Sequence, residues 1–255
     1  MKTILLTGPA RGLGLAISKK LLSEGYRVIG VSRKLTSDFE KLMSEKFSGK
    51  VHFISCDLEK LKEIPELVNG ITRKYGKIYG LVNNAGIAFD GVLATMHGTE
   101  ISKVLRINLE SAIVITKYAC RSMLTNSEGR IINISSIIAS TGFNGLSVYA
   151  ASKAGLEGFM RSLSRELGRS KITVNCVAPG YMETDMTAGT DIPSEAGLER
   201  TQPEHIARAS IFLAAHAPAD MTGISSIYSA QMTIQATLTS PYIFWKRGFD
   251  TRRFS

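Results

Sequence analysis

The sequence predicts an α/β protein built on one doubly wound parallel sheet. Short apolar, β-branched runs alternate with longer amphipathic stretches along most of the 255 residues. The runs are apolar throughout instead of alternating with polar residues, which is typical of strands that are covered on both faces. No linker rich in proline, glycine and serine divides the chain. Regular alternation of this kind favours a single domain with helices on both faces of the sheet.

Six strands are expected in order along the chain. They are TILLTG, YRVIGVS, VHFISCD, IYGLVNNAG, GRIINISS and ITVNCVAPG, at residues 3–8, 26–32, 51–57, 78–86, 129–136 and 172–180. Residues 12–25 predict a helix, because their apolar positions share one face and Gly25 follows the end. A second helical stretch is expected from about residue 37 to 47. Apolar and polar residues alternate from Met232 to Leu238, which predicts an edge strand.

The net charge of +9 indicates an anionic partner. Lysines and arginines are spread along the chain without a dense run, so we expect an anionic cofactor, substrate or carrier protein and no nucleic acid. No stretch approaches the length of a membrane span, and the start MKTILLTGPA lacks the apolar core of a signal peptide. Cys56, Cys120 and Cys176 lack CxxC spacing, which predicts buried free thiols in a reducing cytoplasm. The four histidines show no metal-ligand spacing, so no metal is expected.

The first strand runs into a glycine-rich turn, TGPARGLG at residues 7–14. Gly8, Gly12 and Gly14 allow the backbone to turn tightly and to approach a pyrophosphate at the N-terminus of the following helix. The spacing differs from the usual GxGxxG, but its place between the first strand and the first helix strengthens the interpretation. Ligands of a doubly wound sheet bind at the carboxyl ends of strands, so the other strand ends are the next candidates.

The end of the second strand indicates which nicotinamide dinucleotide is preferred. Ser32 and Arg33 stand where an acid usually binds the adenosine ribose. An arginine attracts the 2′-phosphate of NADP, and Arg11 in the glycine turn supplies a second cation. The sequence therefore favours NADP over NAD, although Arg33 and Lys34 are also compatible with a solvated loop.

Two more strand ends carry polar residues. The third strand ends in CDL, where Asp57 is placed to accept a hydrogen bond from the adenine amino group. The fourth ends in NNAG at residues 83–86, whose small residues let the backbone approach a cofactor. Asn84 can bond to backbone or to ribose. Asn83 has two equal interpretations, a tie between two strands or a direct ligand.

A tyrosine and a lysine share one helix face after the fifth strand. Tyr149 and Lys153 stand four positions apart in YAASK, and Ser136 ends the fifth strand in NISS. A nearby ammonium and the positive nicotinamide of an oxidised cofactor lower the pKa of a phenol from its usual value of about 10. We expect Tyr149 to act as general acid for a carbonyl oxygen that receives hydride. Ser136 then holds that oxygen, and Lys153 also reaches the nicotinamide ribose.

The motifs TGPARGLG, NNAG, NISS, YAASK and APGYMET together resemble the short-chain dehydrogenase/reductase family from Thr3 to about Gly223. The resemblance implies a Rossmann-type fold, a nicotinamide cofactor and a homo-oligomer, either a tetramer or a dimer. It also implies that Asn108 in RINLES supports a proton-relay water and that Thr184 binds the carboxamide. Within the family the chain looks most like the 3-oxoacyl-acyl-carrier-protein reductases. The implied function is therefore NADPH-dependent reduction of a carbonyl, with a 3-oxoacyl thioester on a carrier protein as the first candidate substrate.

The expected site residues follow from these motifs and from the resemblance. The expected catalytic residues are Asn108, Ser136, Tyr149 and Lys153. The expected cofactor-binding residues are Gly8, Arg11, Gly12, Leu13, Gly14, Arg33, Asp57, Leu58, Asn84, Ala85, Gly86, Tyr149, Lys153, Pro179, Gly180 and Thr184.

The chain departs from the family pattern in two places. Between Met186 and Pro203 only TAGTDIPSEAGLERTQ is available, which predicts a short lid and a more open pocket. Residues 224–255 form an atypical C-terminal segment that ends in an aromatic, basic tail. The tail is interpreted as a loose terminus or as a surface for an anionic membrane or a partner. We nevertheless expect residues 1–255 to form one NADP-binding domain.

Two other functions stay open at this point. One is reduction or oxidation of another small carbonyl or alcohol, such as a sugar, a steroid or a xenobiotic ketone. The other is a non-catalytic scaffold that binds NADP. The complete set of Asn108, Ser136, Tyr149 and Lys153 argues against the scaffold.

Overall fold

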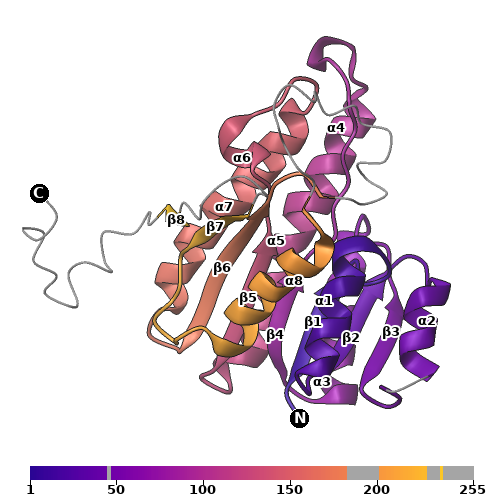
Figure 1. Ribbon diagram of the computed structural model, residues 1–255, viewed down its shortest axis with the longest axis vertical. Helices are drawn as coiled ribbons and strands as arrows, with labels where there is room; N and C mark the ends of the chain where they lie inside the picture. The colour runs from indigo at the N-terminus through magenta and orange to yellow at the C-terminus, as the bar shows by residue number, and fades with distance from the viewer. Residues whose placement is uncertain (45–46, 183–200, 229–235, 238–255) are drawn as a thin grey trace, which may run out of the picture.

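The structure is a computed structural model, and it describes residues 1–44, 47–182, 201–228 and 236–237 of the chain. Figure 1 shows a twisted central sheet with helices packed on both of its faces. Most of the expected lid and the whole aromatic tail lie outside the described residues. In the part of the chain that the structure describes, no helix is both long and apolar enough to cross a membrane.

The sheet has the order β3-β2-β1-β4-β5-β6-β7-β8. Its strands are β1 (Thr3–Thr7), β2 (Arg27–Ser32), β3 (Val51–Ser55), β4 (Ile78–Asn83), β5 (Gly129–Ile134), β6 (Ile172–Pro179), β7 (Ser225–Tyr228) and β8 (Ala236–Thr237). The first seven strands pair in parallel, and β8 pairs antiparallel with β7. Strand order reverses between β1 and β4, so the carboxyl ends of these two strands mark the place where a ligand of such a sheet binds.

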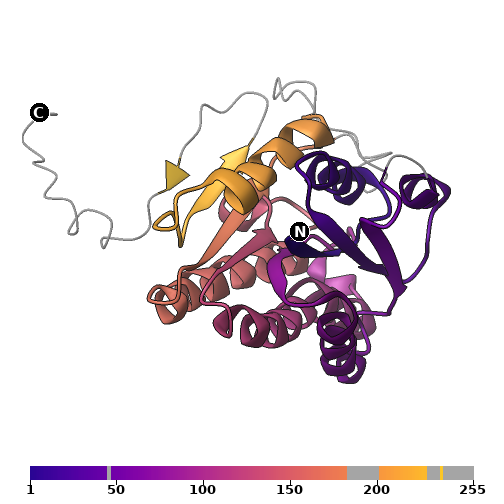
Figure 2. The ribbon, with the colours of Figure 1, turned by 90° about the horizontal axis from the view of Figure 1, so that it is seen from below.

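The helices alternate with the strands. They are α1 (Gly12–Ser23), α2 (Ser37–Ser44), α3 (Ile64–Tyr75), α4 (Gly98–Leu105), α5 (Ser111–Leu124), α6 (Ile138–Thr141), α7 (Ser147–Leu167) and α8 (Pro203–Ile211). Two π-helical turns, η3 (Arg106–Glu110) and η5 (Phe212–His216), follow α4 and α8. The end-on view in Figure 2 places α1, α2 and α8 on one face of the sheet and α3, α5 and α7 on the other.

Each face of the sheet buries its own hydrophobic core. Successive residues of a strand point to opposite faces, so Ile4 belongs to the core under α1 and α8 while Leu5 belongs to the core under α3, α5 and α7. Both side chains are at most 1% exposed. This two-sided burial explains why the strands are apolar throughout. The expectation that Cys56, Cys120 and Cys176 are buried free thiols is confirmed.

The six expected strands and the single doubly wound sheet are confirmed. The seventh parallel strand, β7, was not expected, because its sequence SSIY is short and half polar. It extends the sheet past β6, beginning within the segment interpreted as atypical. Of the edge strand expected from Met232 to Leu238, the described part is β8, which covers two residues.

Candidate active site

The glycine turn joins the end of β1 to the start of α1. Gly8 and Gly12 have φ angles of +65° and +49°, a conformation that side-chain-bearing residues rarely adopt. A Cβ atom on Gly14 would lie 1.9 Å from the carbonyl oxygen of Gly8. The first turn of α1 therefore packs directly on the end of β1, and only glycine fits at this contact.

The N-terminus of α1 suits an anionic group. Arg11 is the N-cap residue, no side chain caps the helix end, and its first turn contains no acid. The first backbone N–H groups of a helix have no intrahelical acceptor, and the helix dipole is positive there. Gly12, Leu13 and Gly14 present these amides beside the strand ends. The chemistry of this helix end fits the diphosphate of a dinucleotide.

The NNAG segment after β4 supports the glycine turn. The Asn84 side-chain amide donates to the carbonyl oxygens of Thr7 and Gly8, at 3.0 and 2.9 Å. The Thr7 hydroxyl accepts from the backbone N–H groups of Asn84 and Ala85, both at 3.0 Å. Of the two roles considered for Asn84, the structure shows the bond to backbone. Thr7 was not among the expected site residues, because its partners lie 77 and 78 positions away in the chain.

Asn83 ties two strands together. Its amide nitrogen donates to Asn133 Oδ1 at 2.8 Å and to Thr116 Oγ1 at 3.0 Å, and the residue is 4% exposed. Asn133 lies on β5 in direct register with Asn83 on β4. The interpretation of Asn83 as a link between strands is therefore the one that the structure supports.

The ends of β2 and β3 carry the expected adenosine-side residues. Arg33 is exposed just after β2, and its carbonyl oxygen accepts from the hydroxyl of Ser55 at 3.0 Å, which holds the two strand ends side by side. Asp57 Oδ1 accepts from the backbone N–H of Glu59 at 3.1 Å, so this carboxylate also stabilises the local turn. Leu58 is 7% exposed and packs in the core under α3 and α5. Leu58 is therefore a residue of the hydrophobic core.

Lys153 and Tyr149 lie on one face of α7 beside the end of β5. The Lys153 side chain is buried, and its Nζ donates to the carbonyl oxygen of Ile134 at 2.8 Å. Burial lowers the pKa of Lys153 to about 8, because the charged ammonium is desolvated. Nζ lies 5.6 Å from the centre of the Tyr149 ring.

The pKa of Tyr149 is raised by burial, and the hydrogen bond from Ser136 acts in the opposite direction. The expected lowering of this pKa depends on the Lys153 ammonium together with the positive nicotinamide of a bound oxidised cofactor, so it stays a prediction. Desolvation disfavours the phenolate more than the polar neighbours stabilise it. The tyrosine and Ser136 are nevertheless brought together as expected, although they come from α7 and from the end of β5.

Asn108 is placed by the π-helical turn η3, which widens the helix between α4 and α5. It is 1% exposed, and its side-chain amide pairs with the backbone of Ile87 through two 2.8 Å hydrogen bonds. Asn108 Nδ2 also donates to Ser152 Oγ at 3.1 Å, and Ser152 Oγ donates to the Tyr149 carbonyl oxygen at 2.7 Å. Ser152, the fourth residue of YAASK, was not expected to connect Asn108 to the helix of the tyrosine.

Gly86 lies where these side chains meet. A Cβ atom there would stand 3.4 Å from Lys153 Nζ and 3.5 Å from Asn108 Oδ1. The four expected catalytic residues are thus gathered at the carboxyl ends of β4 and β5, next to the reversal of strand order. π-Helical turns such as η3 occur often at functional sites, and here the turn delivers Asn108.

The Pro179–Gly180 turn borders the same edge of the sheet. The Pro179 carbonyl oxygen accepts from the N–H of Ile137 at 2.9 Å, and the Gly180 N–H donates to the carbonyl oxygen of Tyr228 at 2.7 Å. The turn is therefore held between the segment after β5 and the end of β7. Thr184, the third expected residue of this segment, lies outside the described residues.

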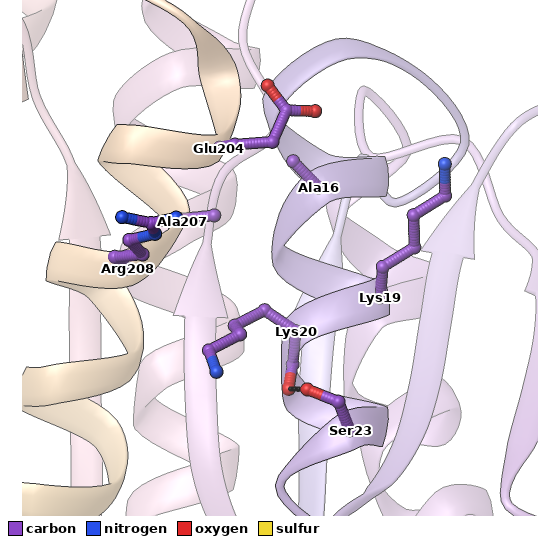
Figure 3. A pocket seen from close by; sticks show the side chains of 7 residues that line it. All are labelled: Ala16, Lys19, Lys20, Ser23, Glu204, Ala207 and Arg208. Atoms are coloured by element: carbon purple, nitrogen blue, oxygen red, sulfur yellow. Dashed lines mark hydrogen bonds between the residues drawn. The ribbon is translucent and has the colours of Figure 1, made fainter.

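A separate groove lies between α1 and α8 (Figure 3). It is lined by Ala16, Lys19, Lys20, Ser23, Glu204, Ala207 and Arg208. Lys20 is paired with Glu24 at 2.7 Å, and the Ser23 hydroxyl bonds to the Lys20 carbonyl oxygen. No residue of the expected catalytic or cofactor-binding set lines this groove, so it is not the candidate active site.

Comparisons with known proteins show which family the chain belongs to. Residues 2–193 match the family described as short chain dehydrogenase. The chain is 36% identical over 231 residues to the 3-oxoacyl-acyl-carrier-protein reductase FabG of Chlamydia muridarum, a match that covers 87% of this chain and 93% of that protein. It is 37% identical over 217 residues to carbonyl reductase family member 4 of Xenopus tropicalis, covering 83% and 90%.

A solved structure shares the fold as well as part of the sequence. It is a Tyr-to-Phe variant of ElxO with NADPH bound, which superposes with a TM-score of 0.81 at 27% identity and covers 89% of this chain and 96% of that one. The family match spans most of the chain, and the relatives match almost over their full length. The chain therefore belongs to the short-chain dehydrogenase family and is an oxidoreductase that uses a nicotinamide cofactor.

Proposed function

We propose that the protein is an NADPH-dependent reductase that converts a carbonyl to a hydroxyl, with a 3-oxoacyl thioester as its substrate. The observation that carries the proposal is the meeting of three side chains at the end of β5. Tyr149 lies close enough to Ser136 for the serine hydroxyl to lower the pKa of the phenol, and Lys153 lies one helical turn further along α7, with Nζ 5.6 Å from the tyrosine ring. A proton donor, a hydroxyl and a cation are thus placed around one point.

Each side chain has a role in carbonyl reduction. Bound NADPH supplies the hydride. Tyr149 donates the proton to the carbonyl oxygen, and its raised pKa keeps that proton on the phenol at neutral pH. Ser136 orients the carbonyl oxygen by hydrogen bonding. Lys153, whose pKa is about 8, is largely charged at neutral pH and stabilises the phenolate that remains after proton transfer.

Asn108 acts through its fixed position. Its amide is held at both ends by the backbone of Ile87, and its nitrogen also reaches Ser152 on α7. We propose that this buried amide sets the spacing between α7 and the η3 turn and supports a relay water beside Lys153. The 3.5 Å separation between Asn108 Oδ1 and a Cβ placed on Gly86 supports this placement.

The preference for NADPH rests on charge. The β2 end reads SRK and carries no acid, and Arg33 is exposed there. Arg11 is the N-cap residue of α1 and follows β1, which is the neighbour of β2 in the sheet. Two guanidinium groups around the adenosine ribose attract a 2′-phosphate, whereas an acid at this place would repel it. The ElxO structure with bound NADPH supports a phosphorylated cofactor in a related fold.

The choice of a 3-oxoacyl thioester rests on the FabG relative and on the positive net charge, which favours an acidic carrier protein. We also propose a cytoplasmic homo-oligomer. NADPH oxidation measured with acetoacetyl thioesters, a sugar, a steroid and a xenobiotic ketone tests the function. Turnover that is highest with the thioester supports it. Turnover with only another carbonyl would show that this compound, and not a thioester, is the substrate. Tight NADPH binding without any turnover would favour the non-catalytic scaffold.

A further inference from the structure

Glu157 occupies an unusual place on α7, one turn beyond Lys153 and two turns beyond Tyr149. Its Oε1 accepts hydrogen bonds from Ser135 Oγ at 2.8 Å and from Ser225 Oγ at 3.0 Å. The carboxylate side chain is 15% exposed, and both serines are buried. One carboxylate oxygen of α7 therefore accepts hydrogen bonds from two buried serine hydroxyl groups.

The two serines stand on either side of β6. Ser225 on β7 is in register with Cys176, and the N–H of Ser135 donates to the carbonyl oxygen of Val177 at 2.7 Å. Cys176 is fully buried between them, and burial together with Glu157 raises the pKa of its thiol. The Glu157 carboxylate therefore spans β6 and joins α7 to the strand on each side of it.

The same face of α7 holds the two neighbours of Ser135 in the chain. Lys153 Nζ donates to the carbonyl oxygen of Ile134 at 2.8 Å, and Tyr149 lies near Ser136, whose hydroxyl lowers the pKa of the phenol. Three consecutive residues at the end of β5 thus each lie against a different turn of α7. The Glu157 contact is the one of these three whose helix residue has no role in the proposed chemistry.

We propose that Glu157 is a positioning residue for carbonyl reduction, which fixes α7 against β5 and so sets the distance between Tyr149 and Ser136. The inference rests on the proposed function. A carboxylate that accepts two buried hydroxyl groups makes strong, charge-assisted hydrogen bonds. Leaving those hydroxyls without an acceptor is costly, so the arrangement resists movement of the helix along the strand.

The carboxylate also links the site to β7. The end of β7 holds the Pro179–Gly180 turn, because the carbonyl oxygen of Tyr228 accepts from the Gly180 N–H. The start of β7 is held by Ser225 on Glu157. A single side chain thus couples the helix of the proton donor to the strand that supports the expected cofactor-side turn. Arg161 Nη1, 3.8 Å from Oε2 at the exposed side, balances the charge.

The test compares Glu157→Leu, Glu157→Gln and the control Glu166→Gln, which removes an exposed carboxylate from the same helix. In Glu157→Leu, kcat is expected to fall by about 10–100-fold, because small displacements of reacting groups are costly. KM for NADPH is expected to change much less than kcat, since the glycine turn is untouched. Glu157→Gln keeps an acceptor oxygen and should restore most of kcat, and the control should match the wild type.

Several outcomes would contradict the proposed role of Glu157. A folded Glu157→Leu variant with kcat within about twofold of the wild type would overturn the inference. A Glu157→Gln variant as impaired as Glu157→Leu would also overturn it, because a hydrogen-bond acceptor would then not be the property required. If Glu157→Leu does not fold, Ser135→Ala and Ser225→Ala replace it. Each should lower kcat, and unchanged kcat in both would count against the inference.

A measurement without turnover separates this inference from the proposed function. The pKa of Lys153, about 8 in the wild type, can be followed by NMR of labelled lysine. Loosening of α7 in Glu157→Leu admits water, so this pKa should rise towards its ordinary value. An unchanged pKa would contradict the positioning role. If the wild type reduces no carbonyl, the proposed function fails, while the titration still decides whether Glu157 holds the helix.

Discussion

Lys153 Nζ lies 5.6 Å from the centre of the Tyr149 ring, and its hydrogen bond goes to the backbone of Ile134. The lysine is therefore anchored to β5 while it stays within electrostatic reach of the phenol. Because burial raises the pKa of Tyr149 and lowers that of Lys153, the protein alone favours the protonated phenol. That state is the one required of a general acid in carbonyl reduction.

Tyr149→Phe should strongly lower turnover without loss of the cofactor site. The substitution removes the phenolic proton donor, but it leaves the ring and the glycine turn in place. Turnover should fall by at least about 10²–10⁴-fold, the usual contribution of general acid catalysis. NADPH affinity, measured by fluorescence titration, should be nearly unchanged. Full activity of the variant would exclude Tyr149 as the proton donor.

Arg33→Asp should reverse the cofactor preference. Arg33 is exposed at the end of β2, beside the end of β3. Loss of a charge-assisted bond to the 2′-phosphate should weaken NADPH binding by about 1.5–3 kcal/mol, and the new acid should favour NADH. The dissociation constants of NADPH and NADH, measured for the wild type and for Arg33→Asp, test this prediction. Equal affinities in the wild type would refute the role given to this strand end, and Lys34→Asp tests whether any nearby acid has the same effect.

Local patterns were sufficient to predict most of the fold and the proposed catalytic pair. Tyr149 and Lys153 are four residues apart on one helix, so their shared face follows from helix geometry alone. Gly14 was expected to let the backbone turn tightly and approach a pyrophosphate; the structure shows that it packs on Gly8, while the approach to a pyrophosphate stays a prediction. The six apolar strands were recognisable for the same reason, since each is a short continuous run covered on both faces.

Contacts between residues far apart in the chain could not be predicted, because they leave no local pattern in the sequence. The Thr7–Asn84 bonds and the Glu157–Ser225 bond join residues 77 and 68 positions apart. The strand β7 was missed because two of its four residues are serine, and one of them binds Glu157. The direction of the Tyr149 pKa shift depends on burial, which spacing in the sequence does not reveal.

Lys153→Met should change how stability depends on pH. The folded-state pKa of Lys153 is about 8, below the ordinary 10.5, so the unfolded chain binds more protons between these values. Burial of the ammonium therefore costs stability below about pH 8, and the cost disappears as the pH rises towards 10.5. At neutral pH the methionine variant should be more stable than the wild type by on the order of 1–3 kcal/mol.

Urea unfolding of the wild type and Lys153→Met across this pH range measures the difference directly. Titrating groups distant from Lys153 are common to both proteins and cancel in the comparison, whereas the nearby Cys176 thiol is coupled to Lys153. The stability advantage of the variant should shrink as the pH rises from about 8 towards 10.5. A difference that does not vary with pH would show that Lys153 is not desolvated as the structure indicates.

Gly14→Ala should disrupt the turn on which the proposed cofactor site depends. The new Cβ would lie 1.9 Å from the Gly8 carbonyl oxygen and 2.7 Å from Asn84 Nδ2, and a backbone oxygen cannot rotate away. The helix start must therefore move from the strand end, with a loss of more than about 3 kcal/mol of stability and of NADPH binding. Gly70→Ala is the matched control, because its Cβ approaches nothing closer than 3.9 Å within α3. Helix propensity predicts that this control is stabilised by up to about 1 kcal/mol. Thermal unfolding and NADPH titration of both variants test the contrast, and a stable Gly14→Ala variant that binds NADPH normally would show that α1 can shift without cost.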